Sequence, residues 1–150
     1  MTNGYNNNII ILITNLNDYY NEGNDMEQKT LTASEWIVMD KLWGREPQVL
    51  AEIIDAIGNK AEWSYQTYAS YLNILCEKGF VGYKRRGRTK FYYPLMEKDE
   101  CIQAESNSMR RKMSKETVEK FLLCMIRDTQ LSEDAQEKLK ALIDELAEKE

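Results

Sequence analysis

Hydrophobic residues recur every three or four positions in three consecutive segments of the first half of the chain. This spacing places them on one face of an α-helix and predicts helices over residues 33–43, 49–57 and 64–78. Thr32 precedes the first helix and Glu35 follows three positions later, which together form a capping-box signature. A glycine follows each of the other two helices, and glycine is common where a helix ends.

Two segments rich in aromatic and β-branched residues follow the third helix and predict strands over residues 80–83 and 89–93. The turn between them, residues 84–88, contains Gly87, which suits a backbone with positive φ. Five cations lie within seven residues of this hairpin: Lys84, Arg85, Arg86, Arg88 and Lys90. A capped helix followed by a basic hairpin is the layout of a winged helix-turn-helix, which indicates binding to double-stranded DNA.

After Pro94 the apolar positions follow helical spacing alone and predict three amphipathic helices. The last two carry apolar stripes that we expect to mediate dimerisation: Phe121, Leu122, Met125, Ile126, Leu139, Leu142, Ile143 and Leu146. About 50 helical residues bury too little surface to be stable alone, and a second copy of the chain would cover the stripes. We therefore predict a mainly α protein with a small β-hairpin: a winged-helix domain over residues 31–97 and a helical dimerisation domain over 98–150.

Residues 1–30 form an N-terminal extension that differs in composition from the rest. Eight of the first 25 residues are Asn, and the only apolar run is Ile9–Ile13. One interpretation is a disordered tail. The other is a non-native extension with the native start at Met26. Asn, Ile and Tyr have AT-rich codons, as expected when intergenic sequence is translated.

Composition narrows the class of function. The 150 residues are 43% hydrophobic and 30% charged, as in soluble globular proteins, and Ile9–Ile13 is far too short to span a bilayer. We therefore expect a cytoplasmic protein. There is no histidine, and the three cysteines are widely spaced without a CxxC pair. These absences argue against a metalloenzyme or a Ser/Cys–His hydrolase, so we expect no enzyme, no metal and no cofactor, and we interpret the cysteines as small buried hydrophobes.

The acidic net charge of −5 does not argue against DNA, because the charge is unevenly distributed. Residues 1–30 and 98–150 each carry a net charge of −3, whereas residues 31–97 carry +1. The local field at the contact surface decides affinity for nucleic acid.

The third helix presents candidate base-reading residues on its outward face: Tyr65, Gln66, Thr67, Ser70 and Asn73. Gln and Asn side chains suit adenine in the major groove. The hairpin cations would neutralise phosphates, and one arginine could enter the minor groove. Ordinary polar surface is the simpler interpretation of the helix face. A winged helix that binds another protein through Tyr65, Tyr68 and Tyr71, with weak or non-specific DNA binding, is the alternative function.

Several motifs in combination carry a family resemblance: Glu35-Trp36, Leu42-Trp43, Trp63-Ser64, Thr67, Lys78-Gly79, Gly82-Tyr83, Gly87-Arg88 and Tyr92-Tyr93-Pro94. From about Leu31 to Ile143, the chain resembles the penicillinase-repressor family of BlaI/MecI/CopY-type bacterial transcriptional repressors. The resemblance implies a homodimer that binds a palindromic operator and blocks transcription. In such a homodimer, the third helix of each chain would face one half-site, and the two half-sites would be separated by a whole number of DNA turns.

The chain departs from the family pattern in two respects. Family members commonly carry Lys or Arg at the positions of Gln66, Ala69 and Ile74, so base reading here would depend on neutral groups. Several relatives are inactivated when a sensor peptidase cuts an Asn-Phe bond, which is replaced here by Cys124-Met125. This replacement argues against the same proteolytic induction, and any upstream sensor stays unidentified. The clustered cysteines of the copper-responsive branch are also missing.

Overall fold

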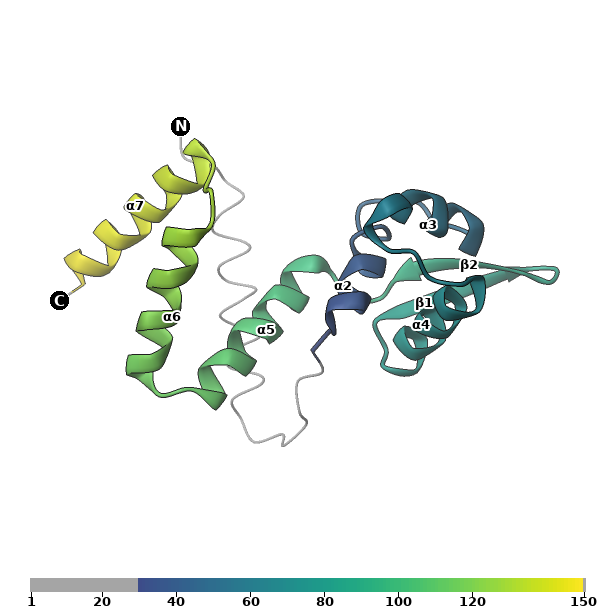
Figure 1. Ribbon diagram of the computed structural model, residues 1–150, viewed down its shortest axis with the longest axis horizontal. Helices are drawn as coiled ribbons and strands as arrows, with labels where there is room; N and C mark the ends of the chain where they lie inside the picture. The colour runs from purple at the N-terminus through teal and green to yellow at the C-terminus, as the bar shows by residue number, and fades with distance from the viewer. Residues whose placement is uncertain (1–29, 150) are drawn as a thin grey trace. The chain divides into compact units, whose positions relative to one another are not determined.

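The computed structural model describes residues 30–149 (Figure 1). The first part of this range folds into a helical core and a two-stranded hairpin. The elements in chain order are α2 (Ala33–Met39), α3 (Leu50–Ile57), the 3-10 turn η1 (Gly58–Lys60), α4 (Tyr65–Glu77), β1 (Val81–Arg86), β2 (Thr89–Pro94), α5 (Lys98–Lys112), α6 (Lys115–Asp128) and α7 (Glu133–Glu148). The chain forms two compact units, and the boundary between them lies between Ser108 and Met109. The two interpretations of the N-terminal extension, including a start at Met26, fall outside the described residues.

The helix starts agree with the capping signals. Thr32 Oγ1 accepts from the Glu35 backbone N–H at 3.2 Å, and the Thr32 N–H donates to Glu35 Oε1 at 2.9 Å, so the capping box is confirmed. Ser64 caps α4 by accepting from the Thr67 N–H. The end of α2 differs from the prediction, because the helix stops at Met39, four residues before Trp43. Residues 40–44 form turns, in which the Lys41 and Leu42 N–H groups donate to carbonyls three residues back and the Trp43 N–H donates to the Met39 carbonyl four residues back.

One hydrophobic core joins all elements of the first unit. Its buried members are Leu31, Val38, Met39, Leu42, Ile53, Ile57, Tyr68, Leu72, Leu75, Phe80, Val81, Tyr92 and Cys101. Three tryptophans, Trp36, Trp43 and Trp63, are half-buried and pack against it. The core therefore holds α4 and the hairpin as one body with α2 and α3.

The hairpin is longer and its turn is tighter than the sequence predicted. Strand β1 runs to Arg86, which pairs with Thr89, so only Gly87 and Arg88 form the turn. Gly87 has a φ of 64° at the first turn position, which a two-residue turn of this kind requires. The expected turn over residues 84–88 is thus wrong for its first three residues. On the other edge of β2, Gln48 forms a single β-bridge with Tyr92, through two backbone hydrogen bonds.

The described residues of the second unit, 109–149, bury none of their side chains in the single chain. Helices α6 and α7 start at Ser114 and Ser132, whose hydroxyls accept backbone N–H groups. Neither helix contains a buried residue, and the apolar stripes are half-buried or exposed. Leu122, Met125 and Leu142, for example, are each more than half exposed. Within residues 30–149, no helix has the length and apolar character needed to cross a bilayer.

Candidate nucleic-acid interface

The hairpin, which we call the wing (residues 81–94), carries cations on both of its faces. Cross-strand partners share a face, and the pairs Tyr83–Tyr92 and Arg85–Lys90 define the first wing face. The second wing face contains Lys84 and Arg86 with their partners Phe91 and Thr89, and also Gly82 and Tyr93. The wing therefore offers positive charge in two opposite directions.

Aromatic rings, and not acids, accompany these cations. Lys90 Nζ lies 4.5 Å from the centre of the Tyr83 ring on the first wing face. On the second, the Arg86 guanidinium lies 5.4 Å from the Phe91 ring centre and Lys84 Nζ 5.9 Å from that of Tyr93. None of the five wing cations joins an ion pair with an acid of residues 30–149. The sequence also has no acid between Glu77 and Glu97, so the wing has uncompensated positive charge.

A recess of about 370 Å³ lies beside the first wing face. Its lining residues are Val49, Leu50, Ala51, Tyr65, Arg85, Arg88, Thr89, Lys90 and Tyr92. Val49 is the N-cap of α3 and its side chain cannot accept a hydrogen bond, while Glu52 takes up only the Val49 N–H at 3.2 Å. The N–H groups of Leu50 and Ala51 therefore have no partner within their helix. Helix N–H groups beside three cations favour an anion such as a phosphate.

The outward face of α4 bears polar groups and no charge. Gln66, Ser70 and Asn73 are exposed on it, and no charged residue occurs in α4 before Glu77. Seven residues of helix separate Gln66 from Asn73 by about 10.5 Å along the axis, and one DNA base-pair step is about 3.4 Å. The two side-chain amides are therefore spaced to reach bases about three steps apart.

Hydroxyl groups of α4 are already engaged within the helix. Thr67 Oγ1 lies 2.9 Å from Ser64 Oγ, and Ser70 Oγ donates to the Gln66 carbonyl at 2.9 Å. Nothing in the described part of the chain binds the side-chain amides of Gln66 or Asn73. These two amides are thus the groups of this face best able to both donate and accept in base reading.

The three tyrosines that an alternative protein-binding surface requires do not form one surface. Tyr68 is 5% exposed, and its hydroxyl donates to the Ala61 carbonyl at 2.9 Å. The ring centre of the half-buried Tyr71 lies 4.7 Å from that of Trp63, with the two rings tilted by 42°. Tyr65 alone is open, at 65% exposure, and it lines the recess. The expectation of an exposed three-tyrosine interface is therefore wrong for Tyr68.

Ionisable groups beneath the wing stay neutral and leave its charge unopposed. Burial raises the pKa of the half-buried Cys76 thiol, although Lys90 acts in the opposite direction. Burial also raises the pKa of the Tyr92 phenol.

Cys101 is buried, but Cys124 is exposed, so the prediction that all three cysteines are buried is wrong for Cys124. No group of residues within the described ranges has the composition of a metal site.

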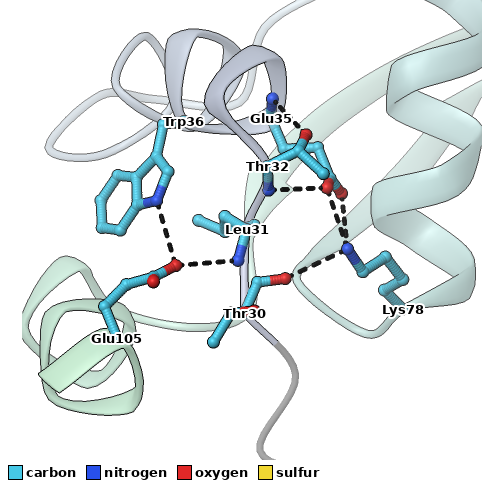
Figure 2. Close-up of polar contacts among 7 residues, drawn as sticks. All are labelled: Thr30, Leu31, Thr32, Glu35, Trp36, Lys78 and Glu105. Carbon is cyan, nitrogen blue, oxygen red and sulfur yellow. Dashed lines mark hydrogen bonds and ion pairs between the residues drawn. The ribbon is translucent and has the colours of Figure 1, made fainter. Parts of the chain in front are cut away.

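A partly buried ion pair joins the end of α4, just before the wing, to the start of α2. Lys78 Nζ donates to both Glu35 carboxylate oxygens, at 2.9 Å from each, and to the Thr30 carbonyl at 3.2 Å (Figure 2). Burial opposes ionisation of Glu35, whose side chain is 3% exposed, but hydrogen bonds from Thr32 and Lys78 hold its pKa below the ordinary value. The pair fixes α4 against α2. The pair has no sequence signature, because 43 residues separate the partners and no local pattern links them.

Comparisons with known proteins agree on one family. A family model described as "Penicillinase repressor" matches residues 31–145. The methicillin resistance regulatory protein MecI of Staphylococcus aureus is 27% identical over 120 residues, which cover 79% of this chain and 98% of that protein. The penicillinase repressor of Bacillus licheniformis is 24% identical over 77% of this chain and 90% of its own length. The transcriptional regulator BlaI of Mycobacterium tuberculosis is 33% identical over 69 residues, covering 45% of this chain and 50% of its own.

Proposed function

The chain belongs to the penicillinase repressor family, and on this premise we propose that it is a transcriptional repressor that binds a palindromic DNA operator as a homodimer. The observation that carries the proposal is the wing, whose five cations have no acidic partner in residues 30–149. Such cations neutralise phosphates and release counterions, which supplies affinity independent of base sequence. Acting on chromosomal DNA of a bacterium, the protein would work in the cytoplasm.

In the proposed complex, α4 lies in the major groove and the wing reaches the neighbouring minor groove. Gln66 and Asn73 read base edges, with Thr67, Ser70 and Tyr65 beside them on the same end or face of α4. The recess beside the first wing face receives a backbone phosphate. Arg88, at the tip of the wing, enters the minor groove, where a narrow A·T-rich groove attracts arginine.

The state of α6 and α7 in the single chain supports the proposed homodimer. Their apolar residues recur at helical spacing yet stay half-buried or exposed. Contiguous exposed apolar surface of this kind marks an interaction site, and a second copy would offer the same two helices in a two-fold arrangement. A two-fold dimer carries two α4 helices and so matches a palindromic operator.

The neutral α4 has a consequence for affinity in this proposal. Since no Lys or Arg of α4 contacts phosphates, the wing and the α3 N-terminus supply most of the electrostatic attraction. Binding should therefore weaken steeply with salt. Cys124 and Met125, at the family's cleavage position, lie inside α6 and not in a loop, so a peptidase would have to open that helix first.

Selection of genomic DNA by the purified full chain, at a low and a moderate salt concentration, tests the proposal. We expect recovery of a palindromic sequence upstream of a small set of genes. The wing is tested with the Arg85→Ala/Lys90→Ala variant. Its matched control is Lys120→Ala, which removes an exposed cation of α6. Recovery of no preferred sequence by the wild type would overturn the operator and favour a protein-binding module with non-specific DNA affinity. Equal recovery by wild type and the wing variant would overturn the assignment of the wing.

A further inference from the structure

The first part of α5 is tied to the start of α2 by a single carboxylate. Glu105 Oε1 accepts from the Leu31 backbone N–H at 3.2 Å and from Trp36 Nε1 at 3.3 Å. Figure 2 shows the carboxylate reaching both donors from α5, on the other side of Leu31 from the Glu35–Lys78 pair. Hydrogen bonds to a charged acceptor are stronger than those between neutral groups. Two such bonds fix the position of α5 on α2.

Further contacts extend this attachment toward the start of α5. Lys98 Nζ pairs with Asp40 Oδ1 at 3.2 Å and lies 5.7 Å from the Trp43 ring centre. Trp43 Nε1 donates to the Met96 carbonyl at 2.8 Å. The face of α5 that includes Cys101, Ala104 and Asn107 is buried, with exposures of 2%, 6% and 7%. About three turns of α5 are thus held against the rest of the first unit.

Helix α5 does not stop where the first unit stops. It continues without a break to Lys112, whereas the division between the two units lies at Ser108–Met109. Glu105 lies three residues before the division. Residues 109–112 therefore continue the same helix as residues 98–108, which the contacts with α2 hold within the first unit.

We propose that Glu105 is a positioning residue that selects the spacing between operator half-sites. The inference rests on the proposed function, since it needs a dimer held together beyond residue 108. B-DNA turns by about one tenth of a full turn per base pair. A dimer whose two α5 helices leave their first units in a fixed direction accepts one spacing, whereas a loosely held α5 tolerates several.

The test measures binding of the full chain to an operator recovered by selection, with the half-sites moved apart in single-base-pair steps up to about half a turn. A DNA with one half-site is measured in parallel. For the wild type, affinity should fall at least about tenfold at half a turn, because one half-site then lies on the opposite side of the duplex. Glu105→Ala should reduce this discrimination to less than about threefold while binding the single half-site like the wild type.

Two further variants separate positioning from loss of structure. Glu105→Gln keeps an oxygen acceptor for both donors and should restore most of the spacing preference. Glu116→Ala, which removes an exposed acid of α6, is the matched control and should leave the profile unchanged. If Glu105→Ala does not fold, Trp36→Phe removes one donor, keeps the Leu31 N–H, and should broaden the profile partially.

The outcomes distinguish the inference from its premise. A spacing profile that is the same for Glu105→Ala and the wild type overturns the positioning role and leaves the repressor proposal intact. Equal loss of affinity for one and two half-sites shows a purely structural role for Glu105 and also overturns it. A wild type that binds no operator at any spacing overturns the proposed function itself.

Discussion

Removal of a single wing cation should reduce the salt dependence of DNA binding. The size of the reduction should show how many chains bind one DNA duplex. Arg85 lies on the first wing face and Arg86 on the second, and neither has an acidic partner within the described residues. Each arginine is therefore available for one phosphate. The slope of log affinity against log salt changes by about 0.9 for each phosphate that the protein no longer neutralises.

The magnitude follows from the number of wings in the complex. A homodimer presents two copies of each arginine, so Arg85→Ala should flatten the slope by about 1.8. Between about 50 and 200 mM salt, the variant's affinity should then fall about twelvefold less than that of the wild type. A single bound chain would give half that change in slope, about 0.9. Because a wing inside the minor groove has a strand on either side, we expect Arg86→Ala to match Arg85→Ala.

The assay is fluorescence anisotropy of labelled operator and non-operator duplexes over a series of salt concentrations. The change of slope should be the same for both duplexes, because phosphate contacts carry no base information. Lys120→Ala removes a cation that pairs with Glu116 on α6, and its slope should equal that of the wild type. If both wing variants kept the wild-type slope, the wing would not contact phosphates. A change for Arg85→Ala alone would show that only the first wing face lies on DNA.

Four other predictions concern the scaffold. Lys78→Met should destabilise the fold by about 3 kcal/mol in urea unfolding, because it leaves the buried Glu35 carboxylate without its cation; adding Glu35→Gln should recover much of that stability, and an additive double variant would contradict the pairing. The folded state lowers the pKa of Glu35 below 4.5, so its stabilising contribution is present above pH 4.5 and is lost as the pH falls through the folded pKa; Glu35→Gln should therefore flatten the acid limb of stability against pH. A Cβ at Gly82 would lie 2.9 Å from the Tyr93 ring, so Gly82→Ala should displace that ring at a cost of about 1–3 kcal/mol, and a wild-type unfolding midpoint would refute the contact. Leu142→Glu should convert the proposed dimer to a monomer in sedimentation experiments, whereas an unchanged mass would remove α7 from the interface.

Local signals predicted the helix starts and the existence of the wing, whereas contacts distant in sequence were not predictable. Thr32 and Ser64 act as caps because the signal and its effect lie within three residues. The turn of the wing was placed too broadly, since Lys84, Arg85 and Arg86 suit a loop by composition and are held in β1 by cross-strand pairing.

For the site, the sequence predicted which residues carry charge and polarity but not their directions. The two wing faces follow from the strand register, and the recess follows from packing of α3 and Tyr65 beside the wing. The engagement of Glu105 with Leu31 and Trp36 spans about seventy residues and has no sequence signature. Exposure of Cys124 was also missed, because its place in an amphipathic helix suggested burial, whereas α6 contains no buried residue in the single chain.

The absence of charge from the outward face of α4 bears on how the proposed repressor can evolve. In the proposed complex, affinity comes from the wing and the recess, which are indifferent to base sequence, while discrimination rests on a few neutral side chains such as Gln66 and Asn73. On this proposal, a substitution at either of these positions would change the preferred base and leave every phosphate interaction in place. Duplicated copies of such a gene can therefore acquire new targets one residue at a time, and each intermediate still binds DNA.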